Sequence, residues 1–328
     1  MDKDQPPLRT VVIATLDDNY IPTQLADSIA KATRETIERV TIIILSERFE
    51  PTASHKPSWG EVQDLLTSLY ILASKEAQAL DKVLLDVDVL LKGPEKPLPL
   101  NLADDIGFRY KLYDVETHTG AHMRPIFELV LIRSPVPASD KTHEISPPTP
   151  SESQDPAPSH PVVVLGGTFD HLHAGHKLFL SMAAWIASEK IIVGVTSDKL
   201  LVNKKHKEVL EGFRVRKANV AAFISRFRPD LEQEIVEIED VYGPTGTDPN
   251  IQALVITPEP STVSGADMID ARRKEKGLPE LKRYTIDVIP IAESTVPGDE
   301  DEETALKRRI EEKMSSTYIR GWIAKNRT

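Results

Sequence analysis

Apolar and polar positions alternate in a regular order along the second half of the chain. Helical spacing of apolar residues is found near 174–188, 212–227 and 265–276. Strands and helices in alternation are typical of a parallel sheet with right-handed crossovers and helices on both faces. The pattern predicts an α/β domain over 161–328, a Rossmann-like doubly wound parallel sheet. Its strands are expected from β-branched apolar runs near 161–167, 190–196, 233–238, 253–257 and 283–290.

The first half of the chain carries a separate set of α/β signals. Its histidines, at 55, 118 and 122, are scattered, and its sequence contains no phosphate loop, triad spacing or metal-ligand cluster. We therefore predict an independent α/β N-terminal domain over residues 1–133 and assign it no role. Its strands are expected at 11–16, 40–45, 83–91, 108–115 and 127–132, and its helices at 23–37 and 59–79.

A proline-rich segment separates the two halves. Residues 134–160 combine proline with small and polar side chains, and they show neither helical nor strand periodicity. Such a segment buries too little apolar area to offset the entropy lost on ordering. We interpret it as an extended disordered linker. Its Ser-Pro and Thr-Pro pairs at 146–147 and 149–150 are candidate phosphorylation sites, although a plain spacer is the favoured interpretation.

Composition limits the functional classes. The chain of 328 residues has no cysteine and a formal net charge of −11. Without cysteine there is no disulfide, thiolate nucleophile or cysteine-based zinc site, and the negative charge disfavours broad nucleic-acid binding. The N-terminus lacks a signal-peptide pattern, and no apolar stretch is long enough to span a bilayer. We expect a cytoplasmic protein, or one that also enters the nucleus.

The first strand of the C-terminal domain leads into the most informative segment, GGTFDHLHAGHK at 166–177. Gly166 and Gly167 allow a ligand to approach the backbone, and the amides at the start of the next helix favour an anion. His173 and His176 lie one helical turn apart, so both imidazoles face the same ligand. Ligands of doubly wound sheets bind beyond the carboxyl ends of the strands. The segment therefore predicts a nucleoside triphosphate site.

A second motif, KMSSTYIR at 313–320, stands near the C-terminus. Ser315 and Ser316 suit the N-cap of a final helix, where hydroxyls and backbone amides offer donors to an anion. Arg320 follows Thr317 by three residues, which places both on one helical face, and a guanidinium there can chelate two phosphate oxygens. Alone the motif is weak evidence, because many such strings only cap a helix. Combined with the first motif it strengthens the triphosphate prediction.

Together the two motifs resemble those of the HxGH nucleotidyltransferase superfamily. Within it, segment 166–177 is similar to the phosphopantetheine adenylyltransferases of the eukaryotic and archaeal type, and the domain layout resembles fungal members. DVYGPTGTDP at 240–249 resembles a loop in the adenylyltransferase domain of animal CoA synthase. LVITPE at 254–259 and RRKEKG at 272–277 resemble the next strand and helix of this branch. The resemblance covers about the C-terminal half of the chain.

The resemblance implies an enzyme that transfers AMP from ATP to 4′-phosphopantetheine, giving dephospho-CoA and pyrophosphate in coenzyme A biosynthesis. It implies that Thr168 orients the attacking phosphate, that His173 and His176 stabilise charge on the α-phosphate, and that Gly175 leaves room for the nucleotide. Mg²⁺ is expected to arrive bound to ATP, without a protein carboxylate cage. The residues expected to hold the departing β- and γ-phosphates are Ser315, Ser316, Thr317 and Arg320.

The cation at the acceptor phosphate is less well defined by the sequence. Lys199 stands where the family has a phosphate-binding lysine, and we expect it to be catalytic. Lys204 and Lys205 compete for this role, but mobile surface lysines are the favoured interpretation of that pair. Arg216 is expected to be an ordinary cation on a helix face. Bacterial members carry an Arg-Gly pair where this chain has TPE at 257–259, which changes the expected adenine and ribose contacts.

Several alternatives compete with this interpretation. His171, His173 and His176 are dense enough for a zinc site, although phosphate binding explains their glycine-rich context better. Another HxGH nucleotidyltransferase, acting for example on nicotinamide mononucleotide, is the rival within the enzyme class. From a different class, the chain is a non-catalytic scaffold of a CoA-synthesising complex, with partners at its N-terminal domain or linker. No P-loop string occurs in the sequence, so we expect a single activity.

Overall fold

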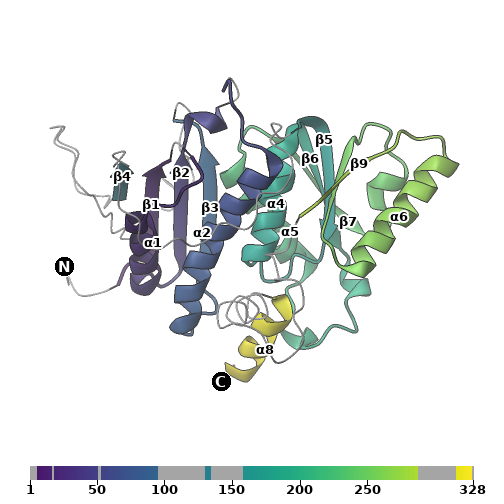
Figure 1. Cartoon of the computed structure of the whole chain (residues 1–328). Helices are drawn as coiled ribbons and strands as arrows, with labels where there is room; N and C mark the ends of the chain where they lie inside the picture. The colour runs from purple at the N-terminus through teal and green to yellow at the C-terminus, as the bar shows by residue number, and fades with distance from the viewer. Residues whose placement is uncertain are drawn as a thin grey trace, which may run out of the picture. The chain divides into compact units, whose positions relative to one another are not determined.

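The computed structural model describes residues 6–16, 18–50, 53–94, 130–133, 158–286 and 315–326. The chain divides into two compact units, Met1–Pro156 and Ala157–Thr328, which we call unit 1 and unit 2. Each unit contains a parallel sheet with helices packed against it (Figure 1). Within the described ranges, no helix combines the length and the apolar character needed to cross a lipid bilayer.

Unit 1 is built on four parallel strands in the order β3-β2-β1-β4. The last expected strand is found as β4, whereas the one expected at 108–115 lies outside the described residues. Nonpolar residues at alternate and consecutive positions of β1 and β2 are buried, as expected for a parallel sheet covered by helices. The elements are β1 (Arg9–Thr15), α1 (Thr23–Glu35), β2 (Arg39–Leu45), α2 (Trp59–Ala79), β3 (Asp86–Lys92) and β4 (Val130–Arg133).

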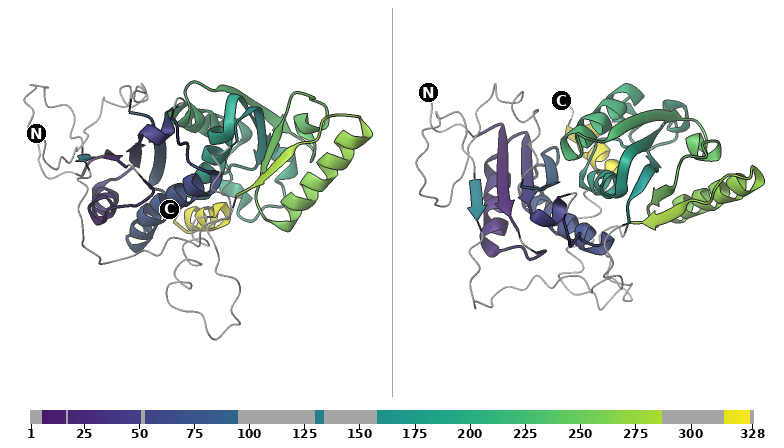
Figure 2. Two further views of the ribbon diagram at one scale, coloured as in Figure 1. Left: turned by 45° about the horizontal axis from the view of Figure 1, so that its top comes forward. Right: turned by 90° about the horizontal axis from the view of Figure 1, so that it is seen from above.

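Unit 2 is built on five parallel strands in the order β7-β6-β5-β8-β9. The sheet separates α4 and α5 from α6, and the views from other directions show the same layering (Figure 2). The strands are β5 (His160–Gly167), β6 (Ala187–Thr196), β7 (Glu232–Ile238), β8 (Ala253–Ile256) and β9 (Lys282–Thr285). The helices are α4 (Ala174–Ile186), α5 (Phe213–Phe227), α6 (Pro260–Glu275) and α8 (Ser316–Asn326).

The predicted α/β fold class is confirmed, with small differences at element ends. β5 begins at His160, the last residue assigned to the linker, and the linker residues 134–157 lie outside the described residues. Helix α6 begins at Pro260, earlier than predicted, because proline fits the first helical position, where no amide hydrogen bond is required. The predicted β9 extends only to Thr285 within the described part of the chain.

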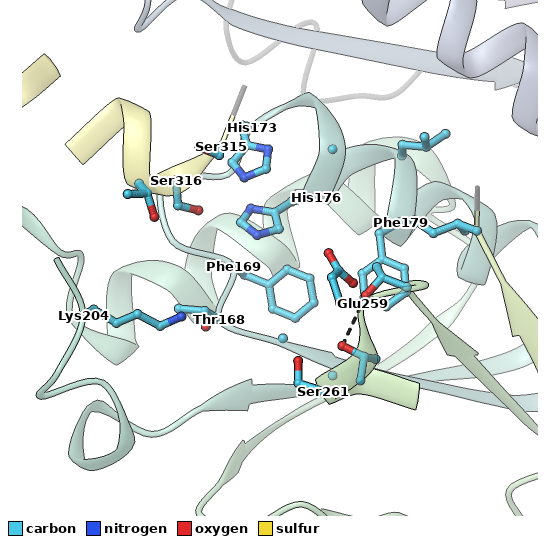
Figure 3. A pocket seen from close by; sticks show the side chains of 18 of the residues that line it. Thr168, Phe169, His173, His176, Phe179, Lys204, Glu259, Ser261, Ser315 and Ser316 are labelled. Carbon is cyan, nitrogen blue, oxygen red and sulfur yellow. Dashed lines mark hydrogen bonds between the residues drawn. The ribbon is translucent and has the colours of Figure 1, made fainter. Parts of the chain in front are cut away.

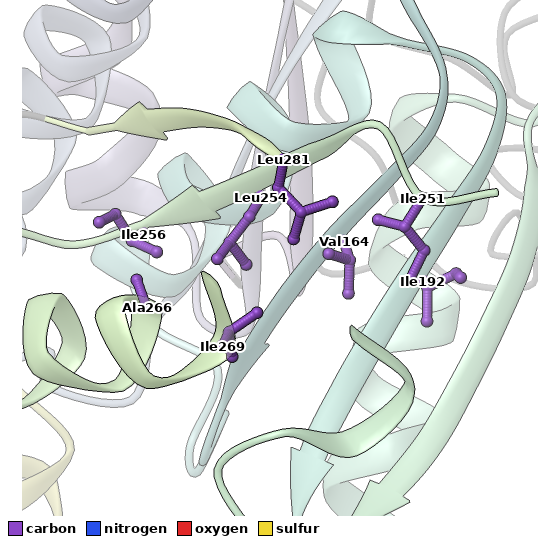
Figure 4. Close-up of a cluster of buried hydrophobic side chains, with 8 residues drawn as sticks. All are labelled: Val164, Ile192, Ile251, Leu254, Ile256, Ala266, Ile269 and Leu281. Atoms are coloured by element: carbon purple, nitrogen blue, oxygen red, sulfur yellow. The ribbon is translucent and has the colours of Figure 1, made fainter. Parts of the chain in front are cut away.

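An apolar cluster joins the sheet of unit 2 to α6 (Figure 4). Val164, Ile192 and Leu254 are register neighbours on adjacent strands, so their side chains share one face of the sheet. Their burial fixes the relative positions of β5, β6 and β8, whose carboxyl ends therefore meet at one edge. The cluster consists of Val164, Ile192, Ile251, Leu254, Ile256, Ala266, Ile269 and Leu281.

Candidate active site

A cavity of about 580 Å³ lies in unit 2, beyond the carboxyl ends of β5 and β8 (Figure 3). This is the edge at which doubly wound sheets bind their ligands. Among the residues predicted from sequence, all but Lys199 line the cavity. The structure thus brings the first and the second motif together around one space. The predicted residues found there are Gly166, Gly167, Thr168, His173, Gly175, His176, Ser315, Ser316, Thr317 and Arg320.

The turn after β5 has an unusual backbone. Phe169 and His171 both have positive φ angles, 53° and 44°, which L-residues seldom adopt. A Cβ atom on Gly167 would lie 3.1 Å from the Phe169 ring, a tight contact with a buried side chain that glycine avoids. A Cβ on Gly166 would meet only ordinary contacts within the protein, at 3.6 Å from Ile238. The bare backbone of Gly166 is instead exposed toward the cavity.

The imidazoles of His173 and His176 are stacked, with ring centroids 3.9 Å apart and an interplanar angle of 26°. The Nδ1 atoms of both rings are buried and have no hydrogen-bond partner among the described residues. Burial lowers the pKa of His176 to about 4. Burial, followed by the neighbouring His176, holds the pKa of His173 well below its usual value. At neutral pH both rings are neutral, and each can donate one N–H to a ligand.

The histidine pair lies at the start of α4, and this position sets its spacing. His173 is the N-cap residue of α4, with extended backbone angles, and His176 lies in the first turn. A Cβ on Gly175 would come within 3.3 Å of the His173 ring. Gly175 therefore leaves space for the His173 imidazole, and it also lines the cavity, where the sequence predicted that it leaves room for the nucleotide. The Phe169 ring packs beside the pair, with its centroid 5.4 Å from that of His176.

Helix α8 begins at the rim of the same cavity. The Ser315 hydroxyl accepts a hydrogen bond from the Tyr318 amide at 3.2 Å, as an N-cap residue does. The Ser316 hydroxyl donates to the Asp170 carbonyl at 2.9 Å, which attaches the helix to the turn after β5. The first amides of α8 lie at the cavity, because Ser315, Ser316 and Thr317 all line it. This end of the helix carries a partial positive charge that favours an anion.

Arg320 lines the cavity and also binds other parts of the protein. Its side chain is 2% exposed, and Nη1 lies 2.5 Å from the carboxylate of the fully buried Asp170. Nε donates to the Lys205 carbonyl at 2.8 Å, and Nη2 donates to the Thr317 hydroxyl at 3.2 Å. Each guanidinium nitrogen therefore already has a protein partner. Arg320 reaches the cavity wall, but it primarily holds α8 against the first motif.

The structure places Lys204, and not Lys199, at the cavity. The Lys199 side chain is 79% exposed and forms an ion pair with Glu239 at 2.6 Å, outside the cavity. Its hydrogen bond to Glu239 raises its pKa. Lys204 lines the cavity, and its amine points toward Thr168 (Figure 3). The sequence indicated the opposite assignment, because the distance along the chain does not reveal how the segment after β6 folds back.

The far wall of the cavity is polar without being cationic. Glu259, Ser261 and Thr262 at the start of α6 line it, together with Thr257 at the end of β8. The Thr257 and Thr262 hydroxyls are 3.3 Å apart and hydrogen-bonded (Figure 3). In the sequence, TPE at 257–259 indicates only a departure from the bacterial pattern. Carboxylate and hydroxyl groups here can form hydrogen bonds with neutral, hydroxyl-bearing groups.

A cluster of potential metal ligands, formed by Asp170, His171 and Glu211, lies beside the site, with ligand atoms within 4.8 Å of one another. These groups bind one another and the backbone. Asp170 accepts the Glu211 amide at 2.9 Å, and Glu211 accepts the His171 amide at 2.8 Å. The His171 ring bonds the Val209 carbonyl at 2.8 Å. This cluster holds the turn after β5 to the segment that precedes α5.

Known proteins match the part of the chain that contains this site. A family model described as cytidylyltransferase-like matches residues 164–321, within unit 2. The chain is 41% identical over 156 residues to the phosphopantetheine adenylyltransferase of Saccharomyces cerevisiae, covering 48% of this chain and 50% of that protein. The match thus spans about half the length of this relative.

Archaeal relatives are matched over more of their length. The phosphopantetheine adenylyltransferase of Pyrobaculum aerophilum is 39% identical over 127 residues, which cover 39% of this chain and 79% of that protein. The protein of the same name from Methanopyrus kandleri is 36% identical over 146 residues, which cover 43% of this chain and 90% of that protein. Most of each archaeal protein therefore has a counterpart in this chain.

Proposed function

Because the chain belongs to the phosphopantetheine adenylyltransferase family of cytidylyltransferase-like proteins, we propose that it transfers AMP from ATP to 4′-phosphopantetheine. The products are dephospho-CoA and pyrophosphate, in the synthesis of coenzyme A. One observation carries the proposal: two neutral, stacked imidazoles with buried, unpartnered Nδ1 atoms line a cavity at a helix N-terminus. A neutral imidazole that lines a cavity can donate one N–H to a ligand, and phosphate oxygens accept such bonds.

In the proposed reaction, the acceptor phosphate is the nucleophile. The second pKa of a phosphate monoester is about 6, so at neutral pH the group is already largely a dianion. No general base is required, and catalysis depends on positioning and on stabilising charge. The low pKa of His176 agrees with a role as a neutral N–H donor. An acceptor oxygen attacks the α-phosphorus, and the bond from that phosphorus to the bridging β-phosphate oxygen breaks.

We assign the groups around the reacting atoms by their place in the cavity. Thr168 orients the attacking phosphate, and its hydroxyl makes no hydrogen bond within the described part of the chain. His173 and His176 donate to the α-phosphate, where charge grows during attack. Lys204, pointing toward Thr168, takes the place of Lys199 as the cation at the acceptor phosphate. Gly166 and Gly167 let the ligand approach the strand end.

The leaving pyrophosphate fits the start of α8. Amides of the first helical turn and the Ser315, Ser316 and Thr317 hydroxyls would hold the β- and γ-phosphates. Arg320 supports this end of the helix and brings its remaining N–H groups to the cavity wall. Mg²⁺ enters with ATP as part of the substrate and is held mainly by phosphate oxygens and water. Any contacts with other proteins of CoA synthesis we assign to unit 1 or the linker.

An acceptor panel tests the proposal. The full chain is incubated with ATP, Mg²⁺ and, separately, 4′-phosphopantetheine, nicotinamide mononucleotide and a flavin mononucleotide, while pyrophosphate release is followed. We expect release with 4′-phosphopantetheine only, and dephospho-CoA as the product identified by mass spectrometry. Release with nicotinamide mononucleotide alone would overturn the acceptor and keep the adenylyl transfer. Absence of release with every acceptor would favour a scaffold.

A further inference from the structure

Arg216 is fully buried in the first turn of α5, although the sequence indicated a cation on the helix face. Its guanidinium donates hydrogen bonds to the Glu211 carbonyl at 2.9 Å and to the Thr168 carbonyl at 2.6 Å. It also donates to the Thr196 carbonyl at 2.7 Å and to an Asp198 carboxylate oxygen at 2.6 Å. One side chain thus binds the residue after β5, the last residue of β6 and the segment before α5.

The turn that Arg216 holds has few restraints of its own. Two glycines precede Thr168, and Phe169 follows it with a φ angle of 53°. Glycine imposes little on its backbone, and a residue in the left-handed region is held there only by its surroundings. The hydrogen bond from the Thr196 hydroxyl to the Gly167 carbonyl, at 3.1 Å, is one such restraint. The hydrogen bond from Arg216 to the Thr168 carbonyl restrains the next peptide along the chain.

We propose that Arg216 is a positioning residue, which fixes the Thr168 peptide and thereby aims the Thr168 hydroxyl at the acceptor phosphate. The inference rests on the proposed function, because it concerns the residue that orients the nucleophile. Arg216 is not among the cavity-lining residues and acts through the backbone. The planar guanidinium reaches several carbonyls in fixed directions, and the compact ammonium of lysine does not. Arg216→Lys keeps the charge beside Asp198 and removes this geometry.

Arg273 offers a matched control within unit 2. It is 1% exposed, lies in α6, and donates to the carbonyls of Pro279, Thr245 and Asp248 at 2.7, 2.7 and 2.9 Å. Neither Arg273 nor these three residues line the cavity. Arg273→Lys therefore reproduces the loss of a buried carbonyl-binding guanidinium without touching the turn after β5.

The experiment compares both variants with the wild-type full chain. For Arg216→Lys we expect kcat to fall by about a hundredfold, the loss typical of a misplacement near 1 Å, while the ATP dissociation constant stays close to that of the wild type. We also expect the Phe169 amide resonance to shift, since its peptide contains the Thr168 carbonyl. Arg273→Lys should leave kcat and this resonance unchanged, whatever it does to the unfolding temperature. Asp198→Asn, which keeps the arginine, should give a smaller loss of kcat.

Several results would overturn the inference. One is a wild-type kcat in Arg216→Lys. Another is an equal loss of kcat in both lysine variants, since that would reflect general destabilisation. If Arg216→Lys does not fold, the inference would be overturned by an unaltered kcat in Asp198→Asn. If the wild type releases no pyrophosphate with any acceptor, the proposed function fails, and an unshifted Phe169 resonance would separately refute the positioning role.

Discussion

The two units wind their sheets in the same way and differ at the end of the first strand. In each unit the first strand lies between the second strand and the fourth, as in β3-β2-β1-β4 and β7-β6-β5-β8-β9. β5 ends in two glycines, and the chain then turns into a helix, α4, that begins with an imidazole pair. Between β1 and α1, residues 16–22 contain neither glycine nor histidine. Sheets wound in this way bind ligands beyond the carboxyl ends of their strands, and in unit 2 a cavity lies there beside the glycine- and histidine-containing turn.

The polar groups at the two turns are also satisfied differently. In unit 1 the Asn19 amide donates to the Glu61 carbonyl at 3.0 Å and accepts from Arg48 at 3.2 Å. Arg48 also pairs with the Glu61 carboxylate at 2.5 Å, so these groups bind one another. In unit 2 the Nδ1 atoms of His173 and His176 have no partner within the described residues. The turn in unit 2 thus has buried nitrogen atoms without a protein partner beside the cavity, whereas the polar groups named in unit 1 are paired with one another.

The largest expected effect comes from removing one imidazole of the pair. His176→Ala should lower kcat about a thousandfold, the loss typical of a donor aimed at developing charge. His55→Ala, an exposed histidine of unit 1, is the matched control and should leave kcat unchanged. Steady-state pyrophosphate release with ATP and 4′-phosphopantetheine measures both. Equal kcat in wild type and His176→Ala would contradict the assignment of a catalytic site to the turn after β5 in unit 2.

A smaller effect is expected from the lysines. Lys204→Ala should raise the KM for the acceptor by about tenfold, since it removes one charged partner of a phosphate. Lys199→Ala removes only an exposed ion pair with Glu239 and should leave this KM near the wild-type value. Acceptor titrations at saturating ATP check both variants. A larger rise in KM for Lys199→Ala than for Lys204→Ala would show that Lys199, and not Lys204, contacts the acceptor phosphate.

The smallest expected effect concerns stability and pH. Burial lowers the pKa of His176 from its ordinary value of 6.5 to about 4. In this interval the unfolded chain binds a proton that folded unit 2 does not, so stability present above pH 6.5 is lost as the pH falls toward 4. His176→Asn should weaken this dependence.

Tryptophan fluorescence can follow unit 2 alone. Trp59 lies in unit 1, whereas Trp185 and Trp322 lie in unit 2, so a Trp59→Phe background reports on the second unit. Urea midpoints at about pH 7 and about pH 5 would then be compared with and without His176→Asn. An identical fall in both proteins would show that other groups cause the acid sensitivity.

Much of the fold and the site could be predicted from local patterns. Strand and helix periodicities are short-range, and they indicated most of the described elements to within a few residues, apart from the earlier start of α6 and the earlier end of β9. The strand expected at 108–115 lies outside the described residues. The GGTFDHLHAGHK segment indicated the turn because glycine and helix-start preferences act over a few positions. The N-cap role of Ser315 was readable for the same reason, since the capping bond spans three residues.

The sequence by itself therefore determined the fold class, the histidine pair and the two motifs that meet around one cavity. Only the tertiary structure decided which long, charged side chains face that cavity. Arg320 pairs with Asp170, 150 positions away, and Arg216 turns inward to the Thr168 carbonyl, 48 positions away. Lys204 replaces Lys199 at the cavity. The physical reason is that a flexible cation takes the nearest partner, and that partner is set by strands and loops distant in sequence.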